Sequence, residues 1–302
     1  MDVITVRHRT RYRYARPVGF GEHRMMLRPR ESFDQHVIAY ALKITPEPSE
    51  LRYIHDVFGN CIGVARFAEQ ACELTFESAV RLEHMPERSL DDPSSPERAR
   101  NSYPFAYEES DLPDLHSCML RAHGDEGRAL SVWSRRFLDT VPKVDAPYVL
   151  AAMTHAIHDE FSYRSRSSGP PQNPLETLRL GSGTCRDFAV LMMEAVRSLG
   201  LAARFVSGYL HVPPREFPGA VRKGGGNTHA WVRVFLPHGG WAEYDPTNGL
   251  VGNRDLIRVA VARDPAQAVP LTGAYEGHRE DYLGMDVDVS VEKRDRRQET
   301  PR

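Results

Sequence analysis

The hydrophobic residues of this chain recur with two different periods, and this change of period constrains the fold more than any other feature. Up to about residue 85 they alternate with polar residues, as from Ile4 to Tyr14, which is typical of β-strands. The runs from Ile38 to Ile44 and from Cys72 to Leu82 alternate in the same way. Several short strands with turns between them and no helical period predict a small β-sandwich over residues 1–85.

The first predicted strand carries an arginine at every second position from Arg7 to Arg13. We interpret this row as the solvated face of a strand. A nucleic-acid-binding surface would give the chain a basic excess, whereas 39 Lys and Arg residues face 41 Asp and Glu residues, a net charge of −2. Hydrophobic residues make up 41% of the 302 residues, which is close to the globular average and excludes wholesale disorder.

Prolines among charged residues mark a boundary from Met85 to Pro104, because such a stretch cannot form a core. We therefore expect a linker over residues 86–125, a second domain over 126–265 and a C-terminal extension over 266–302. In the second domain, apolar residues recur every three or four positions from Cys185 to Leu199 and predict a helix that ends at Gly200. Four strands are expected after this helix: Arg204–Leu210, His229–Leu236, Trp241–Asp245 and Leu256–Ala262. The predicted fold class is α+β.

No apolar run has the roughly 18 residues that a membrane helix needs, and the arginine-rich N-terminus is not a signal peptide. The expected location is the cytoplasm, where the four cysteines would stay reduced. They include no Cys-x-x-Cys pair, and the histidines share no ligand spacing with acidic residues, so neither a metal nor a cofactor is expected. We expect no nucleic-acid or membrane partner.

Cys185 is placed as a nucleophile by the segment Gly181-Ser-Gly-Thr-Cys185. The cysteine falls in the first turn of the predicted helix, where free N–H groups and the positive end of the helix dipole favour a thiolate. Without a partner, a buried apolar role would be equally plausible. Cys61, Cys72 and Cys118 lack a nearby base, and we interpret Arg186 and Asp187 as a structural pair.

His229 and Asp245 supply the missing partners. His229 begins one predicted strand and Asp245 ends the next, so the two are neighbours in an antiparallel hairpin. A turn centred on Pro237 places them directly opposite each other, and a slip of two residues would keep both side chains on one face. Asp245 can then hold one imidazole nitrogen while the other faces the cysteine.

These segments resemble the transglutaminase-like core: Gly-Ser-Gly-Thr-Cys185-Arg-Asp, Ser207-Gly208-Tyr209, Thr228-His229-Ala230-Trp231 and Trp241-Ala-Glu-Tyr-Asp245-Pro-Thr-Asn. The region before Met85 resembles the N-terminal domain that accompanies this core in bacterial transglutaminase-like proteins. The resemblance implies a Cys-His-Asp triad of Cys185, His229 and Asp245. It also implies a papain-like core in which the nucleophile begins a helix packed on an antiparallel sheet.

The resemblance further implies a cysteine peptidase or amidase that passes through a thioester. The substrate would be a protein or peptide with a carboxamide or amide bond. The Cys185 N–H is one expected oxyanion donor, and Tyr163 is the candidate for the second. Trp231 either lines the cleft or lies in the core.

Two other functions remain open from the sequence alone. The acceptor could be a primary amine in place of water, which would make the protein a transglutaminase. Alternatively, it could be a non-catalytic binding module, although the intact triad argues against that. The N-terminal domain could dock a protein partner. The run Gly224-Gly225-Gly226 is interpreted as a mobile lip over the cleft, not as a phosphate loop.

Overall fold

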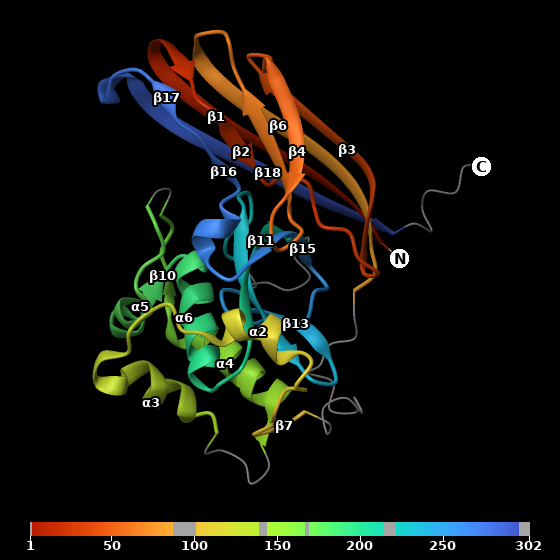
Figure 1. Ribbon diagram of the computed structural model, residues 1–302, viewed down its shortest axis with the longest axis vertical. Coiled ribbons are helices and arrows are strands. Elements are labelled where there is room, and N and C mark those ends of the chain that lie inside the picture. The colour runs from red at the N-terminus through yellow and green to blue at the C-terminus, as the bar shows by residue number, and fades with distance from the viewer. Residues whose placement is uncertain (1, 87–100, 139–143, 167–168, 214–221, 296–302) are drawn as a thin grey trace, which may run out of the picture.

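The computed structural model describes residues 2–86, 101–138, 144–166, 169–213 and 222–295. A β-sandwich forms one end of the molecule, and a mixed layer of helices and sheet forms the other (Figure 1). The proline-rich boundary lies largely at 87–100, outside these ranges. Within the part of the chain that is described, no helix is both long and apolar enough to cross a membrane.

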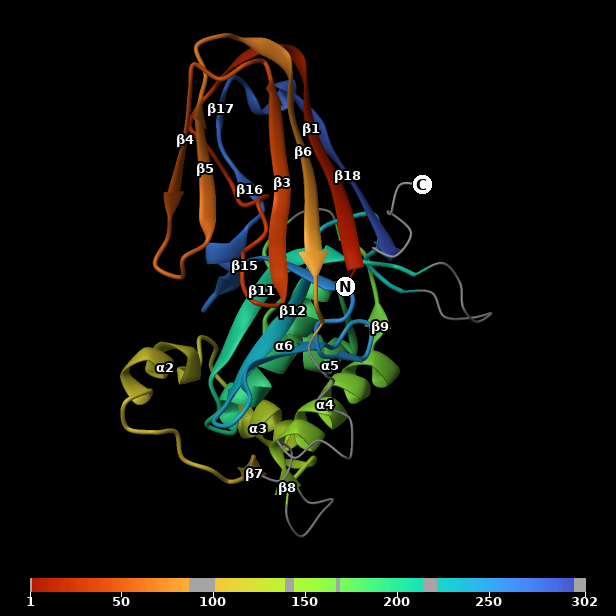
Figure 2. The same cartoon turned by 90° about the vertical axis from the view of Figure 1, so that its right-hand side faces the viewer.

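Two antiparallel sheets build the sandwich, as Figure 2 shows from the side. One sheet has the order β17-β1-β6-β3, with β18 also paired to β1, and the other has the order β16-β2-β5-β4. Tyr14, Phe20, Met25 and Phe76 are among the side chains buried between them. The strands are β1 (Asp2–Phe20), β2 (His23–Met25), β3 (Gln35–Thr45), β4 (Glu50–His55), β5 (Cys61–Arg66), β6 (Ala71–His84), β16 (Leu271–Thr272), β17 (Tyr275–Glu276) and β18 (Tyr282–Asp295).

The arginine row of β1 faces solvent and meets acidic residues of β18. Arg7 pairs with Glu292 at 3.3 Å and Arg9 with Asp288 at 2.9 Å. These are exposed ion pairs, each worth little in stability. Strand β18 pairs with β1 from Asp2 opposite Asp295 onward, so much of the predicted C-terminal extension completes the sandwich.

The second layer is a five-stranded sheet, β14-β13-β12-β11-β15, against which helix α6 packs. Its antiparallel strands are β11 (Ala203–Leu210), β12 (His229–Leu236), β13 (Gly240–Asp245), β14 (Leu250–Val251) and β15 (Leu256–Ala262). The remaining elements are β7 (Ser102–Tyr103), α2 (Leu112–Met119), η1 (Glu126–Arg128), α3 (Ala129–Arg135), β8 (Val144–Asp145), α4 (Ala146–Glu160), β9 (Ser162–Tyr163), α5 (Pro174–Leu180), β10 (Ser182–Gly183), α6 (Cys185–Ser198), η2 (Pro265–Ala268) and η3 (Arg279–Asp281). Helix α6 is apolar at the predicted spacing and is followed by Gly200 at φ +80°.

The β12–β13 hairpin differs from the predicted register by two residues. Leu236 pairs with Gly240 and Val232 with Tyr244, which places Asp245 level with Trp231 instead of His229. The turn is centred beyond Pro237 because Gly240, at φ +63°, closes it. An even slip keeps His229 and Asp245 on the same face of the sheet.

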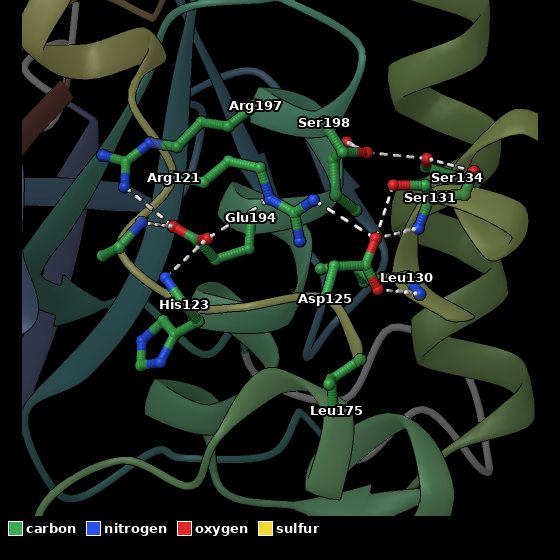
Figure 3. A network of polar contacts seen from close by, with 12 residues as sticks. Arg121, His123, Asp125, Leu130, Ser131, Ser134, Leu175, Glu194, Arg197 and Ser198 are labelled. Carbon is green, nitrogen blue, oxygen red and sulfur yellow. Dashed lines mark hydrogen bonds and ion pairs between the residues drawn. The ribbon is translucent and has the colours of Figure 1, made fainter. Parts of the chain in front are cut away.

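The segment ahead of α3, part of the predicted linker, is fastened to α6 in the structure (Figure 3). The buried Glu194 carboxylate accepts the N–H groups of Ala122 and His123 and pairs with Arg197 at 2.9 Å. Asp125 accepts the N–H of Leu130 at the start of α3. The C-terminal half of α6, the helix that begins at Cys185, is therefore hydrogen-bonded to this segment.

Candidate active site

Cys185 is the first residue of α6, and the turn before it is held by a capping box. Thr184 is the N-cap, and its side chain accepts the N–H of Asp187. The Asp187 carboxylate in turn accepts the N–H of Thr184 at 2.7 Å. Cys185 is 8% exposed and lies at the end of the helix where unpaired N–H groups gather. The local sequence thus fixes the nucleophile candidate at a helix start.

Asp187 is fully buried, and besides closing the capping box its carboxylate binds two residues of the preceding loop. It pairs with Arg166 at 2.9 Å and accepts the N–H of Gln172 at 2.7 Å. A Cβ atom at Gly183 would lie 2.7 Å from the Asp187 Cβ, so only glycine fits there. The predicted pair of Arg186 with Asp187 is wrong: Asp187 pairs with Arg166, and Arg186 donates to the carbonyl of Gly169.

Tyr163 lies beside the cysteine because its short strand pairs with the segment just before it. Tyr163 is opposite Gly183 in the parallel pair β9–β10. Burial, and next the nearby Cys185, raise the pKa of Tyr163 to about 12. The hydroxyl therefore keeps its proton at neutral pH and can donate a hydrogen bond at the site.

His229 and Asp245 form a buried pair. The Nε2 atom of His229 lies 2.8 Å from Asp245 Oδ2, and the two residues are 1% and 0% exposed. Burial disfavours the charged ring, but the Asp245 carboxylate and the Cys185 sulfur outweigh it and raise the pKa of His229. For Asp245, burial is outweighed by His229 and by further hydrogen bonds, so the pKa of that carboxyl is lowered. The carboxylate and the protonated ring therefore stabilise each other's charged forms.

The other ring nitrogen of His229, Nδ1, does not contact Asp245 and is the atom available to Cys185. Its Nδ1 atom is buried and has no hydrogen-bond partner among the described residues. Cys185 is close enough to raise the pKa of the ring. The backbone of Gly224 lies on the same edge, as a Cβ there would be 2.9 Å from Nδ1. Of the three glycines predicted to form a lip, Gly224 thus lies against the histidine.

Asn248 lies beside the pair of His229 and Asp245, and no pattern in the sequence predicts a role for it. Its Nδ2 donates to Asp245 Oδ2 at 2.8 Å and to the carbonyl of Lys223 at 3.2 Å. Its Oδ1 accepts the N–H of Lys223 at 2.7 Å. Asn248 therefore links the acidic member of the pair to the residue before Gly224. The only local signal is its place three residues after Asp245, in a turn.

Trp231 is a core residue and not a wall of the cleft. It is fully buried, and its indole N–H donates to Glu243 Oε2 at 2.9 Å. Its ring is stacked against that of His229, with centroids 6.0 Å apart and an interplanar angle of 27°. The indole supports the histidine from behind.

The other titratable side chains do not join this site in a way that suggests a metal. Cys118 is buried in the core, Cys61 is half-buried and Cys72 is exposed. Across the described ranges, no group of three or more His, Cys, Asp and Glu side chains is arranged to hold a metal ion. The chemistry available at the site is that of a thiol, an imidazole, a carboxylate and nearby N–H and O–H donors.

Two family profiles match the chain. The bacterial transglutaminase-like N-terminal region matches residues 4–83, which form the first strands of the sandwich. The transglutaminase-like superfamily matches residues 139–246, which include Cys185, His229 and Asp245.

Similar proteins match over nearly the whole chain. An uncharacterized protein of Mycobacterium tuberculosis is 33% identical over 298 residues, covering 95% of this chain and 91% of its own. One from Mycobacterium leprae is 29% identical, covering 96% and 97%. A crystal structure of a proposed cysteine protease from Cytophaga hutchinsonii has the same fold, with a TM-score of 0.70, 18% identity, and coverage of 96% and 90%.

Proposed function

The chain belongs to the transglutaminase-like superfamily, and from that premise we propose that it is a cysteine-dependent amide hydrolase with Cys185, His229 and Asp245 as its catalytic residues. One observation carries the proposal. Asp245 holds Nε2 of His229 at 2.8 Å, while Cys185, at the start of a helix, lies near enough to raise the pKa of the same ring. This is the arrangement of nucleophile, base and orienting group that covalent amide hydrolysis needs.

The first half of the reaction forms a thioester. With its proton held on Nδ1 of His229, the Cys185 sulfur attacks the amide carbon, a C–S bond forms, and the carbonyl electron pair moves to oxygen. The electron pair then returns to re-form the C=O bond as the C–N bond breaks, and Nδ1 of His229 gives its proton to the leaving nitrogen. Asp245 fixes the tautomer and stabilises the imidazolium, so that Nδ1 and not Nε2 moves the proton.

The second half returns the enzyme to its starting state. Water attacks the thioester carbon and loses a proton to Nδ1 of His229, and the C–S bond breaks to release a carboxylic acid. The oxyanion that forms in both halves needs two donors. The Cys185 N–H at the helix start is one, and the protonated Tyr163 hydroxyl is the second.

The experiment that tests this function identifies the products. The protein is incubated with a peptide library containing glutamine residues and with a fluorescent primary amine, in water enriched in ¹⁸O. We expect hydrolysis products that carry ¹⁸O, and Cys185→Ala should form none. Amine incorporation without hydrolysis would make the protein a transferase, and a Cys185→Ala variant as active as the wild type would overturn the assignment of the nucleophile.

A further inference from the structure

A line of buried polar contacts leads from the sandwich to the ring behind His229. It begins at Asp34, just before β3, which is 1% exposed. Asp34 Oδ1 lies 2.6 Å from Nη2 of Arg258 on β15, and the Ser32 hydroxyl accepts a bond from the same nitrogen at 2.8 Å. The side chain of one domain therefore neutralises an arginine that is buried in the other.

Arg258 also forms an ion pair with a residue of β13. Its second terminal nitrogen, Nη1, pairs with Oε1 of Glu243, which is 3% exposed. The other carboxylate oxygen, Oε2, accepts the indole N–H of Trp231. Arg258 is held between two carboxylates. The Glu243 carboxylate contacts two guanidinium groups, those of Arg258 and of Arg233 at 3.5 Å, as well as the indole N–H of Trp231.

The indole has little freedom to move. A Cβ atom at Gly208 would lie 2.6 Å from Cη2 of Trp231 and 2.1 Å from the carbonyl oxygen of Ile257. The indole ring therefore packs against the backbone of Gly208, where any side chain would clash with it. Gly208 lies opposite His229 in the β11–β12 pair. The imidazole is stacked on the front of that fixed ring.

We propose that Asp34 and Glu243 are positioning residues for His229, acting through Arg258 and the indole of Trp231. On this view the sandwich is part of the catalytic unit, because its Asp34 completes the charge pairing that fixes the surface behind the imidazole. The inference rests on the proposed function, since it assigns these residues to the same histidine.

Other contacts between the layers offer a matched control. Asn60 is fully buried and makes two bonds to the backbone of Val261, also on β15, and it also bonds to Arg30 and Asp56 within the sandwich. Among the described residues, it has no hydrogen bond to the Arg258 side chain. Asn60→Ala therefore weakens the docking of the sandwich but leaves the line from Asp34 to Trp231 intact. A purely structural role for Asp34 predicts that the two variants behave alike.

The test measures the rate at which iodoacetamide alkylates Cys185 in the full chain, from acidic to mildly alkaline pH. This readout needs no knowledge of the substrate. We expect Asp34→Asn and Trp231→Phe to react about tenfold more slowly at neutral pH, with the midpoint of the pH profile moved away from the wild-type midpoint. Asn60→Ala should keep the wild-type midpoint.

A midpoint for Asp34→Asn that matches Asn60→Ala would overturn the inference. If Asp34→Asn does not fold, Trp231→Phe decides alone, because it keeps every charge of the line and an aromatic ring behind His229. The failure of the proposed function has a different signature. In that case wild-type Cys185 would react no faster than Cys185 in His229→Ala, whatever the other variants show.

Discussion

Gly224 lies against the edge of His229 that faces the cysteine, since a Cβ atom there would be 2.9 Å from Nδ1 and 3.4 Å from Cε1. The residue has φ +88°, which few side chains tolerate. Both the conformation and the close approach therefore require glycine at this position.

The variant Gly224→Ala should lower the rate of Cys185 alkylation on the order of 100-fold, because a methyl group displaces the imidazole from its position. Gly226→Ala is the control. Gly226 has φ +82° but open space around its Cβ, so both variants should lose about 1–2 kcal/mol of stability from backbone strain. Equal slowing of alkylation in the two would mean that strain alone, and not contact with His229, controls the site.

The contact between His229 and Asp245 makes the stability of the fold depend on pH in a defined direction. The pKa of His229 is raised in the folded state, so its contribution is complete below the unfolded value of about 6.5 and is lost as the pH rises through the folded value. The pKa of Asp245 is lowered, so its contribution is present above about 3.9 and is lost as the pH falls through its folded value.

Urea unfolding of the wild type and of His229→Gln should therefore differ most between about pH 4 and pH 6.5. The difference should shrink on both sides of that window. Asp245→Asn should remove the same pH dependence. A difference in free energy of unfolding that grows above neutral pH would contradict the raised pKa of the imidazole.

Asn248 should matter to activity through its bond to Asp245 and its two bonds to Lys223. We expect Asn248→Ala to slow peptide hydrolysis about tenfold, in line with the loss of a partner that orients a catalytic group. Asn248→Asp should be slower still, because it places a second carboxylate beside Asp245.

Thr247→Val is the control for the loop. It keeps the N–H that Thr247 donates to Asp245 at 2.9 Å and removes only a hydroxyl that has no partner within the described structure. Activity of Thr247→Val close to wild type, with Asn248→Ala impaired, is the expected result. Equal impairment would assign the effect to the loop as a whole.

Asp187 should link stability to the reactivity of Cys185. Asp187→Asn removes a charge that Arg166 and two backbone N–H groups share, at a cost of about 2–3 kcal/mol, and should slow alkylation of Cys185. The matched variant is Asp264→Asn, in the capping box of η2, where asparagine caps equally well. It should leave both the thermal midpoint and the alkylation rate unchanged. An alkylation rate in Asp187→Asn equal to that of the wild type would show that the capping box does not control the reactivity of Cys185.

Periodicity predicted the elements around the site well, because each is amphipathic or buried over its full length. Strands His229–Leu236 and Leu256–Ala262 have the predicted bounds. The hairpin register was wrong by two residues because Gly240, and not Pro237, determines the turn, and a turn's backbone angles are not written in the hydrophobic pattern.

Contacts between distant segments had no local signal. Asp34, Glu243 and Arg258 are ordinary charged residues in the sequence, and only the docking of the sandwich makes them a buried line. The sequence suggests a pair of Asp187 with Arg186, whereas the partners of Asp187 are Arg166 and the N–H of Gln172, which lie 21 and 15 residues earlier in the chain. Cys185 and His229, by contrast, lie at the ends of elements that capping and alternation predict.

Strand β1 pairs with β18 from Asp2, which lies opposite Asp295, to Tyr14. During synthesis the ribosome releases β1 first and its partner only after α6 and the sheet of the second layer. The second layer is therefore synthesised while one edge of β1 still lacks its partner strand. Pairing over such a separation forms slowly. A newly made chain therefore cannot complete the first sheet of the sandwich until β18 has been made.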